Sequence, residues 1–125
     1  MKKNNANEDQ ILMQDNLKRA VAQMLILNLL AEKECYIGEL TDEIRSRSNG
    51  VLNILFPYSS ICRMMHDGII AEGPKRRSPD GRLRKYYAIT DKGRLRLEQQ
   101  TYTFMQYTES VEAMLCENAG AVDRP

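Results

Sequence analysis

The residues best suited to chemistry in this sequence are basic, and they gather between positions 75 and 96. This stretch holds nine lysines and arginines against two aspartates, a net charge of +7, whereas the whole chain carries only +1. A basic block in a nearly neutral chain is typical of a phosphate-binding surface. The alternative is that the charges only keep the edges of a solvent-exposed hairpin from aggregating. A few charges suffice for that purpose, and this block has many more. The residues that we assign to DNA here are Lys75, Arg76, Arg77, Arg82, Arg84 and Lys85.

A second set of candidates lies just before this block, on a predicted short helix. Ile61, Met64 and Met65 have the spacing of a core-facing stripe, which leaves the other positions to solvent. Serine hydroxyls suit phosphate oxygens and base edges, and arginine suits guanine or phosphate. Packing of Tyr58 under the hairpin and pairing of Arg63 with a surface acid are the alternatives. The DNA-facing candidates on this helix are Tyr58, Ser59, Ser60 and Arg63.

The elements that must position these residues form a recognisable series. A helix is predicted over residues 37–47, with Ile37, Leu40 and Ile44 facing inward. The short helix follows and ends at Gly68. Two β-leaning runs, 69–71 and 86–89, then flank a polar segment with turn signals that include Asp80-Gly81. The series predicts a winged helix-turn-helix domain over residues 9–93, in a mainly α chain with a small β-hairpin (α+β).

The first and last helices predict a homodimer. The helix expected over 9–31 is apolar nearly all round, and a small core covers only one of its faces. Thr90 is a good N-cap for a last helix to about residue 117, of which 94–117 form the expected dimerisation helix. Residues 1–8 and 118–125 are expected to be disordered. The predicted dimer interface comprises Leu17, Met24, Leu97, Phe104, Val111 and Leu115.

Several classes of protein are disfavoured by the sequence. No apolar run approaches the ~20 residues that span a bilayer, and the polar N-terminus lacks the core of a signal peptide, so we expect a cytoplasmic protein without a membrane partner. Cys62 and His66 are spaced to share a helix face, but a structural zinc site needs four ligands, so no metal or cofactor is expected. With one histidine and no nucleophile motif, we expect no enzyme activity.

The motifs on these elements resemble those of the PadR-type transcriptional regulators, especially the short members with a single C-terminal helix. Tyr58, Ile61, Arg63 and Met64 follow the family's L-Y-x-x-L-x-R-L register. The hairpin is more specific, because residues 81–93 follow its G-x-x-R-x-Y-Y-x-[IL]-T-x-x-G pattern. The resemblance covers residues 25–97. The chain departs from the family at Pro57, where leucine is usual, and at Ile37-Gly38, where Gly-Tyr is usual.

The resemblance implies a dimeric repressor that binds a pseudo-palindromic operator in double-stranded DNA and is released by a small-molecule effector. Some short relatives bind flat aromatic drugs between tryptophans at the dimer interface. This chain has no tryptophan, so that pocket is not carried over. The alternative function is a winged-helix protein-interaction module without DNA binding, against which the +7 segment argues.

Overall fold

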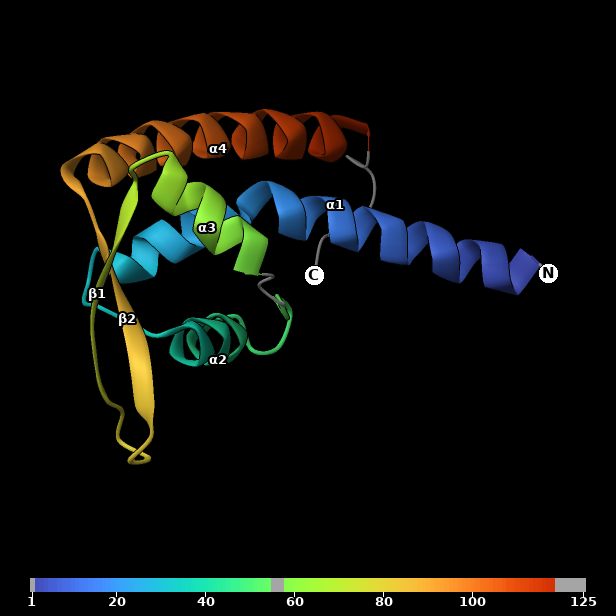
Figure 1. Cartoon of the computed structure of the whole chain (residues 1–125). Coiled ribbons are helices and arrows are strands. Elements are labelled where there is room, and N and C mark those ends of the chain that lie inside the picture. The colour runs from blue at the N-terminus through green and yellow to red at the C-terminus, as the bar shows by residue number, and fades with distance from the viewer. Residues whose placement is uncertain (1, 55–57, 119–125) are drawn as a thin grey trace.

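The protein has the architecture of a winged helix, in which helices pack together and one long hairpin projects from them (Figure 1). The computed structural model describes residues 2–54 and 58–118. The predicted mainly α fold with a small hairpin is confirmed. Its elements are α1 (Lys2–Leu30), α2 (Ile37–Arg47), α3 (Tyr58–His66), β1 (Ile70–Arg77), β2 (Leu83–Ile89) and α4 (Asp91–Asn118).

The core forms where the last turns of α1 meet α2, α3 and the base of the hairpin. The residues predicted to face inward on α2 and α3 do so: Leu40 and Ile61 are almost fully buried, and Ile37 packs against the core. Removal of these aliphatic side chains from water is the main stabilising contribution to such a fold. The other buried side chains of this cluster are Ile26, Leu27, Leu29, Leu30, Cys35, Ile44, Ile54, Met64, Ile69, Ile70 and Tyr87.

The hairpin is an antiparallel pair that is longer than the two predicted runs. Ile70 lies opposite Ile89 at its base and Arg77 opposite Leu83 at its tip. The register shifts between Glu72 and Lys75, where the chain reads Gly-Pro. A proline cannot donate to the ladder, and an irregularity of this kind accommodates it. The two strands thus carry the basic residues well beyond the core.

The first helix is longer than the sequence predicted. It begins at Lys2, so most of the segment expected to be a disordered arm lies in α1. The physical reason is that neither glycine nor proline, the two residues that disfavour a helix most, occurs among residues 2–30. Asn118 ends α4, and the rest of the expected C-terminal disordered segment lies outside the described residues, as does Pro57.

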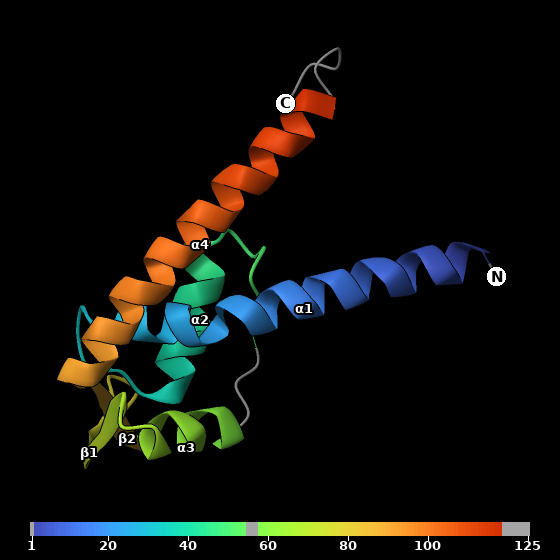
Figure 2. The same cartoon turned by 90° about the horizontal axis from the view of Figure 1, so that it is seen from above.

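The two long helices lie beside each other at one end and diverge at the other. Figure 2 shows α4 crossing over α1 near the core, after which the N-terminal half of α1 and the C-terminal half of α4 separate. Gln100 of α4 donates a hydrogen bond of 2.9 Å to Gln23 of α1 near this crossing. In the described part of the chain, neither helix is apolar over a length that would cross a membrane.

Candidate nucleic-acid interface

The solvent face of α3 carries the candidates that the sequence placed there. Tyr58 is 74% exposed, and Ser59, Ser60 and Arg63 are also exposed. The opposite face buries Ile61 and Met64, so the amphipathic pattern fixes which side chains can meet a partner. None of the four side chains has a hydrogen bond or ion pair within the described residues, so all of them are available to a ligand.

The hairpin, which we call the wing, presents cations along both strands. Lys75, Arg77 and Arg82 are exposed, whereas Arg84 and Lys85 are partly covered. Some of these cations already have protein partners. Arg77 donates to the carbonyl oxygen of Gly81 at 2.7 Å, and Lys85 pairs with Glu72 at 3.2 Å. The hydrogen bond from Lys85 to this carboxylate raises the pKa of Lys85, so the ammonium group stays charged.

A groove of about 450 Å³ joins the wing to α3 and to the first turn of α2. It brings together four of the predicted residues: Tyr58 of α3 with Lys75, Arg84 and Lys85 of the wing. Ser59, Ser60, Arg63, Arg76, Arg77 and Arg82 do not line it. Cations and phenol groups along one groove suit a polyanionic backbone, because phosphate oxygens accept from both.

The first turn of α2 contributes to this groove through Tyr36 and Gly38. The sequence indicated Gly38, because a glycine there permits close approach of a backbone or phosphate. Tyr36 was missed. It occupies the N-cap position without a side-chain capping bond and stacks edge-on to Tyr86 of the wing, with ring centroids 5.4 Å apart. Its role depends on a residue 50 positions away, so local sequence carries no signal for it.

The wing tip is an ordered turn centred on the predicted Asp80-Gly81 pair. Gly81 has φ of +85°, which favours glycine. The carboxylate of Asp80 accepts from the hydroxyl of Ser78, from the backbone N–H of Arg82 at 3.2 Å and from the guanidinium of Arg84 at 3.0 Å. These bonds, that from Ser78 foremost, lower the pKa of Asp80 to about 2. The carboxylate of Asp80 therefore stays ionised over the neutral pH range and can accept these bonds.

Two further cations of the basic segment support the fold. Lys92 of α4 donates to the carbonyl oxygen of Asp67 at 2.7 Å, and Arg96 lies 3.6 Å from the carboxylate of Asp67. Both contacts attach α4 to the turn after α3. The charge count along the sequence therefore overstates what faces a ligand.

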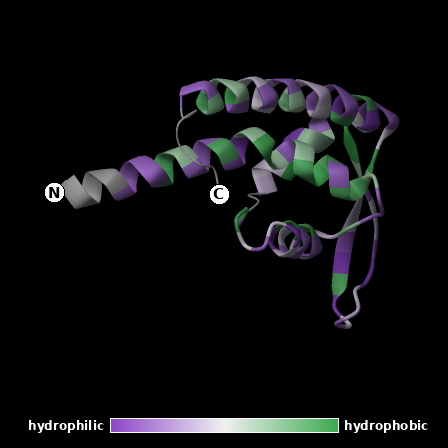
Figure 3. Ribbon diagram, turned by 180° about the vertical axis from the view of Figure 1, so that it is seen from behind, coloured by the Kyte–Doolittle hydropathy of each residue, from purple (hydrophilic) through white to green (hydrophobic). Residues whose placement is uncertain are grey.

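A second groove, of about 660 Å³, lies between α1 and α4. It is lined by four of the predicted interface residues, Leu17, Met24, Phe104 and Val111. The other two differ: Leu97 packs against the chain's own core, and Leu115 is 61% exposed but does not line the groove. Figure 3 shows hydrophobic residues recurring along both helices, in contrast to the largely hydrophilic wing. We call this feature the α1/α4 groove.

Metal ligation has no support among residues 2–54 and 58–118, which contain no group of three or more histidine, cysteine or acidic side chains that could hold an ion. Cys62 and His66 both lie exposed on α3. Cys35 is buried, and burial raises the pKa of its thiol to about 11, so this cysteine is a protonated core residue.

The helices, the two-stranded wing and the amphipathic α3 define a winged helix-turn-helix protein. Residues 26–99 match the family described as "Transcriptional regulator PadR-like family". This match covers more than half of the chain, which therefore belongs to the PadR-like family of transcriptional regulators. Members of this family are transcription factors and not enzymes.

Solved structures of bacterial regulators share this fold. A transcriptional regulator from Clostridium thermocellum is 23% identical, with a TM-score of 0.69, over 78% of this chain and 96% of that one. A PadR-like regulator from Bacillus cereus is 25% identical, with a TM-score of 0.67, over 80% of this chain and 96% of that one. A PadR family regulator from Clostridium difficile is 24% identical, with a TM-score of 0.62, over 76% of this chain and 98% of that one. No curated protein matches the chain.

Proposed function

We propose that this protein is a homodimeric repressor that binds a specific sequence of double-stranded DNA in the cytoplasm. The observation that carries the proposal is the groove of about 450 Å³ that joins Tyr58 of α3 to Lys75, Arg84 and Lys85 of the wing. A DNA-binding winged helix needs both surfaces on one side, because the helix meets base edges while the wing meets phosphates.

The two surfaces have different tasks in this proposal. The side chains of α3 read sequence, with Arg63 able to donate two hydrogen bonds to a guanine. The wing contacts the phosphates of the DNA backbone and supplies affinity that does not depend on the DNA sequence. The proposed DNA-binding surface comprises the residues predicted from the sequence, whether they contact DNA or position those that do: Tyr58, Ser59, Ser60, Arg63, Lys75, Arg76, Arg77, Arg82, Arg84 and Lys85.

The α1/α4 groove supports dimerisation as part of this proposal. Phe104 is 36% exposed, Val111 52% and Leu17 55%, so the groove offers apolar surface that a second copy would cover. A two-fold dimer presents two α3 helices to the two halves of a pseudo-palindrome, about one helical turn apart.

Release by a small-molecule effector completes the proposal. The volume of the α1/α4 groove falls in the range of ligand sites, roughly 300–1,000 Å³. The side-chain oxygen of Gln100, a residue that lines this groove, is buried without a hydrogen-bond partner in the described part of the chain. A donor group on an effector, or on the second copy, would satisfy it.

The experiment that tests DNA binding is footprinting on the DNA upstream of the protein's own gene, because such regulators often control their own expression. We expect one protected pseudo-palindrome, and an affinity that falls linearly on a log–log plot by about 0.9 per neutralised phosphate as salt rises. A scrambled duplex of the same length is the control. Failure to bind either duplex at low salt would favour the protein-interaction module.

A further inference from the structure

One arginine of the wing already has two partners within the protein. The guanidinium of Arg76 donates to the carboxylate of Glu34 at 2.6 Å, and its carbon lies 3.8 Å from the centre of the Tyr86 ring. Tyr86 in turn meets Tyr36 edge-on at 5.4 Å. Arg84 lies 5.0 Å from the centre of the Tyr36 ring. Three of these side chains, Arg76, Arg84 and Tyr86, lie on the wing, and Arg84 and Tyr86 contact Tyr36 of the connection that leads into α2.

These contacts join parts of the chain that are distant in sequence. Glu34 and Tyr36 belong to the short connection between α1 and α2, and Arg76 lies 42 residues after Glu34, on β1. The backbone reinforces this junction, because Cys35 and Tyr87 exchange hydrogen bonds of 3.2 and 2.9 Å as an isolated antiparallel bridge. Beyond this bridge the wing projects away from the helices (Figure 1), so its direction is set here.

The engagement of Arg76 limits its freedom to contact phosphate. Its planar face is stacked on Tyr86 and one of its terminal nitrogens is bound to the carboxylate of Glu34, so a paired contact from both terminal nitrogens to one phosphate would require it to leave Glu34. Arg82, near the tip of the same wing, has no side-chain partner within the described residues and is exposed. The two arginines therefore differ in their freedom to meet DNA.

We propose that Glu34 and Arg76 form a strut that fixes the direction of the wing, so that Arg76 is a positioning residue for DNA binding and Glu34 is its required partner. This inference rests on the proposed function, because it assigns a role within the DNA-binding surface. Glu34 is acidic and lies beside a surface that binds a polyanion, which is the opposite of what affinity alone would favour. The strut explains why a carboxylate stands there.

The strut acts on direction more than on stability. Both side chains are about half exposed, at 50% for Arg76 and 47% for Glu34, and exposed ion pairs contribute little to the free energy of unfolding. The wing, however, is a two-stranded hairpin that few contacts hold to the helices. A small change in the orientation of its base therefore changes where its tip meets the DNA backbone.

Whether Glu34→Gln weakens or strengthens DNA binding distinguishes the strut from a phosphate contact. Glu34→Gln removes the carboxylate and leaves a side chain of the same shape. The strut predicts weaker DNA binding, by about three- to fivefold, which is the scale of one exposed ion pair. If Arg76 instead bound phosphate, Glu34→Gln would free it, remove a negative charge, and strengthen binding. Unchanged or stronger binding to the operator would overturn the proposal.

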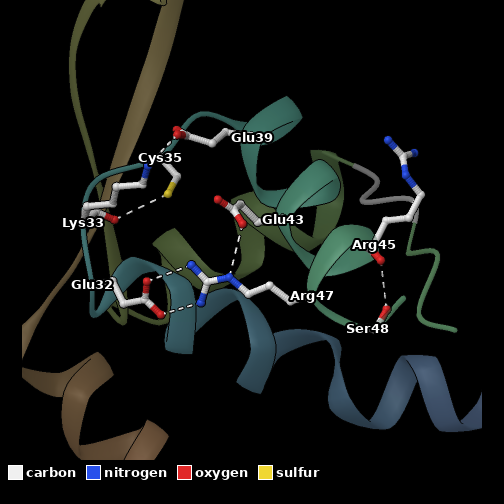
Figure 4. A network of polar contacts seen from close by, with 8 residues as sticks. All are labelled: Glu32, Lys33, Cys35, Glu39, Glu43, Arg45, Arg47 and Ser48. Atoms are coloured by element: carbon white, nitrogen blue, oxygen red, sulfur yellow. Dashed lines mark hydrogen bonds and ion pairs between the residues drawn. The ribbon is translucent and has the colours of Figure 1, made fainter. Parts of the chain in front are cut away.

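The matched control is Glu32→Gln, two residues earlier in the same connection. Glu32 accepts from both terminal nitrogens of Arg47, at 2.7 and 2.9 Å, and this pair holds α2 rather than the wing (Figure 4). The change in charge is the same. We expect operator affinity to stay at or above that of the unsubstituted protein. Equal weakening by both variants would assign the loss to the connection in general and overturn the strut.

The salt dependence gives an independent measurement. Arg76→Gln should lower operator affinity while leaving the log–log salt slope unchanged, because the number of neutralised phosphates stays the same. Arg82→Gln, with its side chain free to reach DNA, should reduce the slope by about 0.9. A slope reduced equally by Arg76→Gln would make Arg76 a phosphate ligand.

A last measurement needs no DNA and so separates this inference from the proposed function. Backbone ¹⁵N relaxation of Ser78 and of residues 80–82 in the DNA-free protein reports the order of the wing tip. Glu34→Gln should increase the motion of the tip relative to the helices, and Glu32→Gln should not. Unchanged relaxation would overturn the strut, even in a protein that binds its operator. Failure of the unsubstituted protein to bind DNA would overturn the proposed function and the role of Arg76 in DNA binding, whereas the relaxation data would still show whether Glu34 and Arg76 order the wing.

Discussion

Gly93, in the first turn of α4, lies directly against the backbone of Ile69: a Cβ atom at Gly93 would stand 2.1 Å from the carbonyl oxygen of Ile69. The same oxygen accepts the backbone N–H of Thr90 at 3.1 Å. The hydroxyl of Thr90 accepts from the N–H of Gly93 at 3.0 Å, which confirms Thr90 as the N-cap, and donates to the carbonyl oxygen of Gly68 at 2.6 Å. The start of α4 is thereby fixed on the turn that precedes β1.

This contact predicts that Gly93→Ala destabilises the protein. The new methyl group would overlap a backbone atom, which cannot rotate away as a side chain can. We expect the free energy of unfolding to fall by about 1–3 kcal/mol, the usual cost of overpacking. Urea denaturation followed by circular dichroism measures it.

Gly38→Ala is the matched control, because it adds the same methyl group to the first turn of another helix. There the nearest atom, at 3.2 Å, belongs to the side chain of Tyr36. The gain in helix propensity, about 1 kcal/mol, opposes any small adjustment of that ring. A loss of stability as large as that at Gly93 would contradict the role given to the Ile69 carbonyl.

The α1/α4 groove predicts that acidic substitutions yield monomers. Phe104→Asp or Val111→Asp would place a carboxylate in the apolar surface that the second copy is proposed to cover. Light scattering at micromolar concentration should change from twice the chain mass to 14.4 kDa, with weaker operator binding. Val51→Asp alters a 76% exposed side chain outside the groove, so its dimer should persist. A monomeric unsubstituted protein would contradict the proposal directly.

The exposed position of Arg63 on α3 predicts that it contributes to sequence recognition. Arg63→Ala should cost about 1–3 kcal/mol on the operator, because a guanine would lose two hydrogen bonds, and less on random DNA. Fluorescence anisotropy with both duplexes measures the two losses. Equal losses would make Arg63 a phosphate contact, and no loss on either would remove α3 from the recognition surface.

The turn at the wing tip predicts a structural change in acid. The pKa of Asp80 is lowered to about 2 from an ordinary value of 3.8, so its contribution to the folded turn is complete above pH 3.8 and is lost as the pH falls through about 2. Amide signals of Gly81 and Arg82 in NMR spectra should shift over this range. Asp80→Asn should abolish that titration and loosen the tip at neutral pH. A titration of these signals that survives Asp80→Asn would contradict the assignment.

Structural features that depend only on neighbouring residues could be predicted from the sequence. The bounds of α2, the inward face of α3, the cap at Thr90 and the turn at Gly81 agree with the predictions, because side-chain periodicity, capping and glycine backbone freedom act over a few positions. The N-terminus of α1 is the exception. Polar composition suggested disorder there, but composition does not end a helix that lacks glycine and proline.

Contacts between distant segments were decided only by the tertiary structure. Counting charges along the chain could not show that Arg76 meets Glu34, 42 residues earlier, while Arg82 stays free of side-chain partners in the described residues. Nor could spacing show Tyr36 against Tyr86. Such pairs depend on hairpin register and on how the connection before α2 meets the wing. Sequence alone therefore determined which residues are basic, and only the packing decided which of them face outward.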